Sequence, residues 1–490
     1  MTPTAPPDSV ADALDFGAAA EIIARLPLHQ PVEAEIRLGN LLGRVLAQPP
    51  SASELFSLLE YARPSLHFVR ATAVRHYHDL APHLEAQAEA HFQRGLELWQ
   101  RVVAAYQRCA ELERPADPQA AAALLHRCLM YSGMQIIEHY RAKREVPADL
   151  WRQLHGYYHI AEQEDLSRIA LVHDLPDEPH TPNIQAQYVA HLLLEIAQPY
   201  SRNATDFNLI WQWAERWAHL VRVGKPRIAA GMIAFVVDLA GDRPLHPRAG
   251  GTLPESIRAL GTKALIEALH AQLADLDHPD AGERLHLSSE GVLRHRHLLD
   301  QLVSSWSMAM LPRRFKRTPS AETVTLTASF HGIHEALSQP AARAASTETW
   351  RVIDHTPNGF RLARESDGLP IENGQLVALC PHDGGDYLLA QVQWLMRDQS
   401  GFLLAGFSIL PGIPRSIGMA AEERFKGQNV RLVRAFLLPA VAAMQSEASL
   451  VIPSGFYQAG RIVDVDDGKW QLGELIQRGN DFDRASYRQI

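Results

Sequence analysis

Four positive charges crowd one short segment of this 490-residue sequence. Arg313, Arg314, Lys316 and Arg317 fill four of five consecutive positions. A guanidinium group is planar, so it can make paired hydrogen bonds to phosphate oxygens and can stack on a purine. The segment could therefore hold an anionic ligand that carries a purine. Its ordinary alternative role is that of a solvated linker.

A polar turn further along the chain could complete such a site. The segment Asp354-His355-Thr356-Pro357-Asn358-Gly359 leads directly into the strand-like sequence FRLAR. Glycine tolerates positive φ and close backbone approach to a ligand, which gives Gly359 a functional reason beside its ordinary role in a β-turn. The basic segment and this turn must be brought together by the elements around them.

Helices are expected from about Ala18 to Leu311, because apolar residues recur there at alternating spacings of three and four. The clearest stripe consists of Phe92, Leu96, Trp99, Val103, Tyr106 and Ala110. Further helices are expected at Gln119 to Lys143, Pro147 to Glu164, Ile184 to Tyr200, Asp206 to Val223, Leu253 to Leu276 and Glu290 to Met310. Short breaks rich in proline and glycine favour an antiparallel array, which could be solenoid-like, although no tetratricopeptide signature repeats at a fixed period.

Beyond Arg317 the pattern is that of short strands separated by Gly, Asn and Asp turns. The expected strands are Val324 to Phe330, Thr349 to Asp354, Gly359 to Arg364, Gly374 to Cys380, Asp386 to Leu395 and Gly401 to Leu410. Six short strands predict a small barrel, with a helical insertion at His331 to Thr347. A β-rich tail from about Asn429 either extends this barrel or forms a second one.

Composition restricts the compartment and the partners. The net charge is -9 and the apolar content is 46%, so no global positive field favours nucleic acid or an anionic membrane. The sequence begins without the pattern of a signal peptide, and the apolar run Ala229 to Ala240 is too short to span a bilayer. Cys109, Cys128 and Cys380 are widely spaced, which fits a reducing compartment. We expect a cytoplasmic protein that binds no nucleic acid and does not insert into a membrane.

The order of these motifs resembles the PilZ domain family. PilZ domains pair an RxxxR segment at the start of a barrel with a (D/N)xSxxG turn between the next two strands. This chain offers RRFKR at Arg313 to Arg317 and DHTPNG at Asp354 to Gly359, followed by AQVQW and LLAGFSIL, which are similar to two later PilZ strands. The segment Thr327 to Gly332 also fits xxSxxG, but it lacks the leading Asp or Asn.

The resemblance implies cyclic di-GMP as the ligand and assigns roles to particular residues. Arg313 and Arg317 would grip the phosphates and stack on guanine, with help from Arg314 and Lys316. Asp354 would accept hydrogen bonds from the guanine edge, Thr356 would replace the usual serine, and Gly359 would close the turn. The insertion at His331 to Thr347 need not separate the two motifs in space.

The resulting fold class is multidomain α + β, with an N-terminal all-α helical array followed by a C-terminal PilZ-like β-barrel and a further β-rich segment. We expect a flexible N-terminus at 1–17, a helical domain at 18–311, the PilZ-like barrel at 312–415 and the β-rich extension or second barrel at 416–490.

Signals for other functions are weaker. His155 and His159 have the spacing of two ligands on one helical face, but the HExxH glutamate is absent, so a histidine pair at the surface or the edge of the core is preferred to a metal site. Trp99, Trp211, Trp213 and Trp217 are interpreted as core residues. The sequence shows no nucleophile elbow, Walker loop or Rossmann fingerprint, nor a GGDEF, EAL or HD-GYP motif. We expect no catalytic residues and no metal.

These observations favour a signalling receptor. Cyclic di-GMP would bridge the Arg313 to Arg317 segment, here called the basic arm, and the Asp354 turn. It would thereby change the orientation of the helical and β portions, and an unidentified protein partner would respond to that change. The resemblance suggests pilus or flagellar control, and hence surface attachment or motility. The alternative is a degenerate PilZ-like adaptor that binds a protein without nucleotide; an enzyme with an unrecognised helical active site is the third hypothesis.

Overall fold

The computed structural model describes residues 16–78, 85–171, 181–226, 235–245, 254–307, 316–338, 347–365, 368–381, 386–421, 432–465 and 468–490. The chain forms two compact units, which are described separately below. The helical unit comprises 1–142, 146–199 and 204–311, and the β unit comprises 143–145, 200–203 and 312–490. Within the described ranges, no helix is long and apolar enough to cross a membrane.

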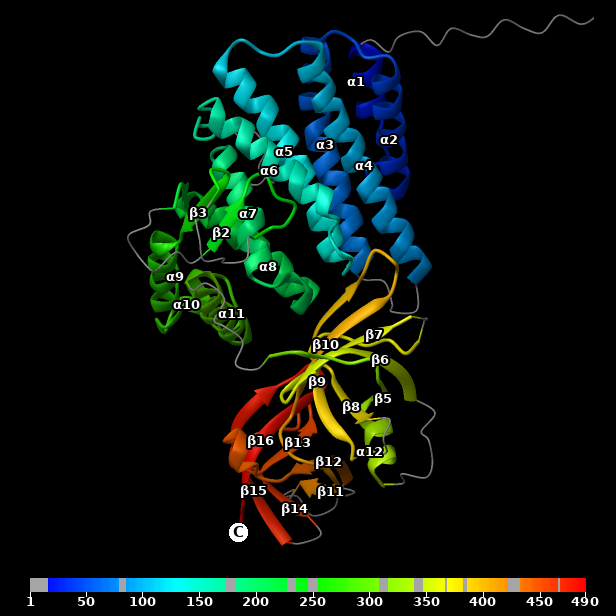
Figure 1. The fold of residues 1–490 in the computed structure, drawn as a ribbon, viewed down its shortest axis with the longest axis vertical. Coiled ribbons are helices and arrows are strands. Elements are labelled where there is room, and N and C mark those ends of the chain that lie inside the picture. The colour runs from blue at the N-terminus through cyan, green and yellow to red at the C-terminus, as the bar shows by residue number, and fades with distance from the viewer. Residues whose placement is uncertain are drawn as a thin grey trace, which may run out of the picture. The chain divides into compact units, whose positions relative to one another are not determined.

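The helical unit consists mainly of helices that pack against their chain neighbours (Figure 1). They are α1 (Phe16–Ala24), α2 (Pro31–Ala47), α3 (Ala52–His78), α4 (Glu85–Leu112), α5 (Pro118–Arg141), α6 (Ala148–Gln163), α7 (Ile184–Ile196), α8 (Ala204–Trp217), α9 (Lys263–Leu276), α10 (Ala281–Arg284) and α11 (Ser289–Ser307). Short 3₁₀ turns lie at Pro199–Ser201 and Ala218–Leu220. The prediction of a helical N-terminal part is confirmed.

Local chemistry explains where the best predicted helices begin. The Asp117 carboxylate accepts a hydrogen bond from the backbone N–H of Ala120 at 2.8 Å, and Pro118 opens α5. The Asn183 side chain caps α7 in the same way through the backbone N–H of Ala186 at 2.9 Å. Both caps lie directly after proline-rich breaks in the sequence, so the helix starts were predictable within a residue or two.

Stacked aromatic rings form the centre of the helical core. The ring of Tyr131 on α5 stacks on Trp99 and on Tyr106 of α4, with centroids 5.4 and 5.6 Å away, and all three side chains are buried. Trp211, Trp213 and Trp217 of α8 are buried as well, so the interpretation of the tryptophans as core residues is confirmed. Of the expected stripe of α4, Phe92, Trp99, Val103 and Tyr106 are buried, whereas Leu96 is half-buried and Ala110 is exposed.

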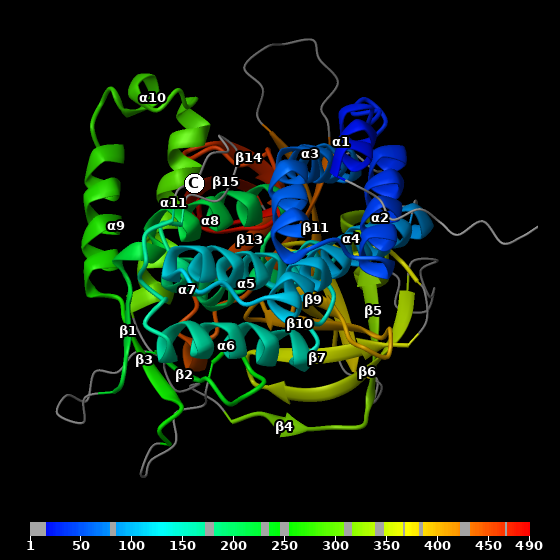
Figure 2. The same ribbon diagram turned by 90° about the horizontal axis from the view of Figure 1, so that it is seen from above.

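One part of the helical prediction was wrong. A three-stranded antiparallel sheet lies among the helices, in the order β1 (Arg222–Gly224), β3 (Ile257–Gly261), β2 (Phe235–Asp238), and Figure 2 shows it beside α9. The expected helix at Leu253 to Leu276 begins only at Lys263, because Ile257 and Leu260 are buried in β3. The expected helical domain is therefore not all-α. Its strands were missed because strands of three to five residues are too short to show a period of two in the sequence.

The first barrel of the β unit contains the six predicted strands. They are β5 (Thr323–Ala328), β6 (Thr347–Thr356), β7 (Gly359–Arg364), β8 (Leu376–Pro381), β9 (Leu388–Arg397) and β10 (Leu403–Ile409), and the short β4 (Thr318–Pro319) is added outside β6. Pairing of β6 with β7 closes the sheet on itself, with Trp350 fully buried inside. The insertion after β5 contains the expected helix, α12 (Phe330–Ser338).

The C-terminal tail forms a second, closed barrel. Its strands follow the order β11 (Arg415–Ala421), β12 (Leu432–Leu438), β13 (Ser449–Pro453), β16 (Phe482–Gln489), β15 (Gly468–Arg478) and β14 (Ile462–Val465). Of the two arrangements that the sequence allowed, a second barrel is therefore correct. A shared apolar cluster joins the two barrels, since Leu376 and Leu389 of the first pack with Phe436 and Phe482 of the second.

Candidate functional site

The β6–β7 hairpin positions the turn predicted to face the ligand. Only Pro357 and Asn358 separate the strands, so Thr356 pairs with Gly359 and Asp354 pairs with Arg361. A bulge between Val352 and Asp354 shifts the register at the point where the carboxylate lies. β-bulges re-aim side chains, and this one lies next to the proposed ligand contact.

The structure brings the basic arm and the acidic turn into direct contact. Thr318 of β4 pairs with His355 and Pro319 pairs with Asp354, so the chain that leaves Arg317 runs along β6. Arg317 then makes an ion pair with the Asp354 carboxylate at 2.5 Å. The RxxxR and DxSxxG-like motifs are far apart in sequence, yet each contributes one partner of this pair.

A second arginine holds the other oxygen of the same carboxylate. Arg361 Nη2 lies 2.6 Å from Asp354 Oδ2, while Arg317 contacts Oδ1. Asp354 is only 6% exposed, whereas the side chains of Arg317 and Arg361 remain 31% and 39% exposed. Two guanidinium groups against one carboxylate leave a net positive charge at the surface, which suits a phosphate.

Sequence reasoning missed Arg361. The signal was present, because a two-residue loop fixes the pairing of the hairpin and so places Arg361, two residues after Gly359, opposite Asp354. The other expected cations are placed less fully. Lys316 is exposed, and Arg313 and Arg314 lie outside the described residues.

The turn residues have structural roles of their own. Thr356 Oγ1 accepts a hydrogen bond from the backbone N–H of Asn358 at 3.3 Å, so the threonine hydroxyl braces the turn. Gly359 does not adopt positive φ, and that part of the prediction was wrong. Its small size is needed for another reason, because an added Cβ would lie 2.2 Å from the backbone oxygen of Phe407 on β10. The close approach is therefore to a neighbouring strand.

Two rival sites have ordinary structural explanations. In the segment Thr327 to Gly332, Ser329 adopts φ of 70° and its hydroxyl accepts a hydrogen bond from the backbone N–H of Gly332, which caps α12. His155 is fully buried, and its ring nitrogens lie 2.8 Å from the Tyr188 hydroxyl and the Arg243 carbonyl. No cluster of three or more potential metal ligands exists within the part of the chain that the structure describes.

Comparison with known proteins places both ends of the chain in one family. Residues 17–227 match the N-terminal domain of the cyclic-di-GMP receptor FimW, and residues 418–490 match the FimW C-terminal beta-barrel domain. The chain belongs to the FimW family. A relative from Pseudomonas aeruginosa, described as the cyclic-di-GMP receptor FimW, is 22% identical over 489 residues, covering 84% of this chain and 79% of its own length.

The family assignment fits the observed architecture. The FimW N-terminal match covers the described helices α1 to α8, and the C-terminal match covers nearly all of the second barrel. The first barrel, with Arg317, Asp354 and Arg361, lies in sequence between the two matches. The expectation of a long receptor-family member with an N-terminal helical region is confirmed.

Proposed function

We propose that this chain is a receptor for cyclic di-GMP and that the nucleotide binds where the basic arm meets the Asp354 turn. One observation carries the proposal: the ion pair between Arg317 and Asp354 unites the two motifs whose order resembles a PilZ domain. Family membership supports the ligand, since the FimW relative is described as a cyclic-di-GMP receptor. The PilZ-like domain would extend over 312–415, between the helical domain at 18–311 and the β-rich domain at 416–490.

Binding requires an exchange of partners at Asp354. Arginines engage both of its carboxylate oxygens, and a guanine edge needs the same oxygens for its N1 and N2 donors. Arg317 would leave Asp354 for a phosphate, joined by Arg313 and Arg314, while Arg361 stays beside the carboxylate on the hairpin. Thr356 and Gly359 would hold the turn in shape. The positive charge released by this exchange favours an anionic ligand.

The exchange also supplies a signal. Arg317 belongs to the segment that connects the helical portion to the first barrel, so ligand that captures this arginine changes the order and direction of the connection. We propose that a protein partner of the helical region responds to this change in the cytoplasm. The response would control surface attachment or motility. The protein would act as a receptor and not as an enzyme.

Titration calorimetry of the full chain with cyclic di-GMP, and with GMP as the control ligand, tests the site. A hydrogen bond to a charged group is worth about 1.5–3 kcal/mol, so Arg317→Ala and Asp354→Asn should each weaken binding roughly ten- to hundredfold. Arg351→Ala is the matched control, because Arg351 also lies on β6 but pairs with Glu365 at 3.3 Å. Equal affinity of all three variants would place the nucleotide elsewhere.

One observation favours the adaptor as a second candidate. Asp354 is nearly buried and already satisfied by two arginines, which is also the arrangement of a purely structural ion pair. An adaptor would show no heat of binding with cyclic di-GMP at any concentration, and Asp354→Asn would then lower only the stability of the barrel. The same titration therefore separates the two functions.

A further inference from the structure

A wide groove lies on the helical unit, entirely within the segment that matches the FimW N-terminal domain. Its volume is about 1460 Å³, larger than the roughly 300–1,000 Å³ of sites for small molecules. One wall is the stretch of α3 from Pro64 to Arg75, and the other is α8 with the turn that follows it, from Asn208 to His219. Each wall presents about three helical turns.

The rim of the groove is positively charged. Arg75 and Arg216 are exposed on opposite walls, and neither makes an ion pair with any residue in the described part of the chain. Arg75 donates a hydrogen bond to Thr72 at 3.1 Å, and Arg216 lies 5.6 Å from the ring centroid of Trp217. In a chain with a net charge of -9, these two cations form a local field that attracts an anionic partner.

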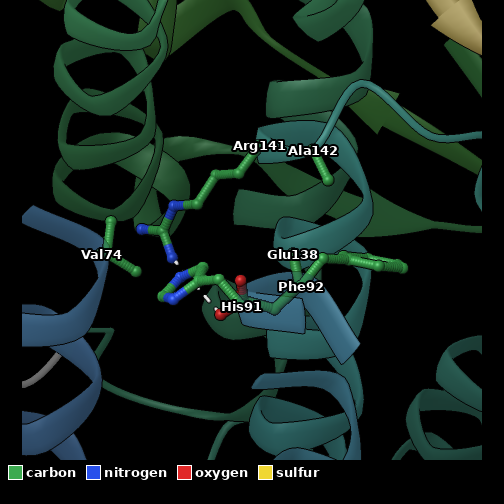
Figure 3. A pocket seen from close by; sticks show the side chains of 6 residues that line it. All are labelled: Val74, His91, Phe92, Glu138, Arg141 and Ala142. Atoms are coloured by element: carbon green, nitrogen blue, oxygen red, sulfur yellow. Dashed lines mark ion pairs between the residues drawn. The ribbon is translucent and has the colours of Figure 1, made fainter. Parts of the chain in front are cut away.

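Two further ionisable side chains of the groove, Arg141 and Glu215, are largely withdrawn from solvent. Figure 3 shows a smaller pocket that shares Val74 and Arg141 with the groove; there the Arg141 guanidinium turns toward His91 and Glu138, and it lies 3.7 Å from the Glu138 carboxylate. Glu215 is the acidic residue of the lining, and burial holds its pKa well above the ordinary value of 4.5 although Arg141 acts against this. Its Oε1 is buried and makes no hydrogen bond within the described residues. The charge that a partner meets is therefore that of the arginine rim.

Apolar side chains between the charged rims are unusually open. Phe68 on α3 is 48% exposed and Leu28, in the connection between α1 and α2, is 40% exposed, and both line the groove. Trp211 on α8 also lines the groove, but it is only 6% exposed. A partner that fits must bring apolar side chains to the centre and negative charges to both edges. An amphipathic helix with an acidic polar face has this pattern, and two walls three turns long suit helix-in-groove recognition.

We infer that this groove binds an acidic amphipathic helix of a partner protein, with its apolar face on Phe68 and Leu28 and its carboxylates on Arg75 and Arg216. The inference rests on the proposed role of the helical region as the partner-binding part. It names the chemistry of that partner and places the contact on α3 and α8. It does not depend on the position of the nucleotide site.

Fluorescence anisotropy with a labelled 15-residue peptide tests the inference on the full chain. The probe carries leucines at helical spacing and glutamates at all other positions, and a second probe replaces every glutamate with lysine. The acidic probe should bind, the lysine probe should not, and binding should weaken with added salt. Arg75→Glu combined with Arg216→Glu should lower the affinity at least tenfold, and Phe68→Ala should lower it as well.

Lys263→Glu on α9 is the matched control, because Lys263 is 92% exposed and does not line the groove. It should change the affinity less than twofold. If Lys263→Glu weakened probe binding as much as the two arginine reversals do, the effect would come from the net charge of the chain, and the inference would be overturned. Equal binding of the two probes, or no effect of the arginine reversals, would also overturn it. Sedimentation of the same variants checks the remaining occupant: a dimer that dissociates on arginine reversal, without probe binding, would assign the groove to a second copy of the chain.

The outcome is distinguishable from that of the proposed function. Cyclic di-GMP titration of the arginine-reversed chain should match the unmodified chain, since Arg75 and Arg216 belong to the helical unit. A chain that binds the acidic probe but no cyclic di-GMP contradicts only the nucleotide receptor. A chain that binds cyclic di-GMP but not the probe contradicts only the groove.

Discussion

At the scale of single residues, Glu138 is a buried carboxylate that connects several helices of the helical core. Its carboxylate lies 2.7 Å from Arg70 Nη2 and accepts a hydrogen bond from the Trp99 indole at 3.1 Å, and all three side chains are buried. Arg70 also pairs with Glu35 of α2 at 2.5 Å. Four helices, α2 to α5, therefore meet in one charge network that compensates its own desolvation.

Glu138→Gln should destabilise the helical unit by about 3–5 kcal/mol, because it leaves buried guanidinium groups without full compensation. Chemical denaturation followed by circular dichroism measures the loss. Glu97→Gln on α4 is the control, since the Glu97 side chain is 62% exposed, lies 3.8 Å from Arg101, and should matter by less than about 1 kcal/mol. Equal losses for the two variants would deny the network its role.

The same carboxylate predicts a pH dependence. Burial alone would raise the pKa of Glu138, but Arg70 and Arg141 outweigh it and lower the pKa from 4.5 to about 2. A depressed pKa in the folded state means that the ionised form contributes stability above about pH 4.5, and that this contribution is lost as pH falls toward 2. The stability difference between the unmodified chain and Glu138→Gln should therefore shrink across this window; a constant difference would contradict the assignment.

A substitution at Gly359 tests whether this glycine is required for the packing of the first barrel. Gly359→Ala places a Cβ 2.2 Å from the Phe407 backbone oxygen, and β10 cannot yield as a side chain would. We expect a loss of roughly 1–3 kcal/mol in the stability of the first barrel. Gly418→Ala on β11 is the control, because its nearest neighbour would lie 3.9 Å away. Thermal denaturation that gives both variants the same midpoint would show that the hairpin has room.

Sequence reasoning could name Arg317, Asp354 and Gly359 because their motifs are local. It missed that Asp354 is shared with Arg361, because the short loop predicts that the two residues pair but not that their side chains meet. Nor could it find the exchange of partners that we propose for ligand binding. A residue's type and spacing indicate which chemistry it can perform, but its partners within the chain are set by the fold.

At the scale of elements, predictability followed the strength of the periodic pattern. The bounds of β7 were predicted to the residue, because Gly359 and Arg364 limit an alternating segment between turns. β5 ends two residues earlier than expected, because Ser329 takes a left-handed conformation and starts α12. The predicted start of helix α9 was too early, because the apolar residues of β3 resemble the first turn of a helix.

Helix α12 is the element that joins the two barrels. Phe330 is the first residue of α12, and its ring centroid lies 4.7 Å from that of Phe436 on β12. Phe436 is fully buried in the cluster shared by both barrels. Phe436→Ala should cost about 3–5 kcal/mol in the free energy of unfolding of the β unit. Leu432→Ala, on the same strand but 76% exposed, should change it by less than about 0.5 kcal/mol. Denaturation monitored by near-ultraviolet circular dichroism distinguishes the two outcomes.

At the scale of the whole molecule, the β unit behaves as one folded body made from two barrels. Backbone and side chain bonds reinforce the shared apolar cluster, since the Leu376 backbone N–H donates to the Asp481 carboxylate at 2.8 Å and the Asn480 backbone N–H donates to the Gly374 carbonyl at 2.9 Å. The FimW C-terminal match begins inside β11, at residue 418, which makes the second barrel look separable by sequence alone. The packing indicates that it is not.

A chain that ends at Pro414 should therefore aggregate, because removal of the second barrel exposes the buried side chains of Leu376, Leu389 and Leu410. Light scattering and binding of a hydrophobic dye measure the exposed surface. Leu389→Glu is a control with opposite signs: it should improve the solubility of the shortened chain, where the position faces water, and destabilise the full chain, where it faces the second barrel. A shortened chain that stays monodisperse and dye-free would mean that the first barrel folds alone. The second barrel would then be a separable module, with no part in holding Asp354 and its arginines in place.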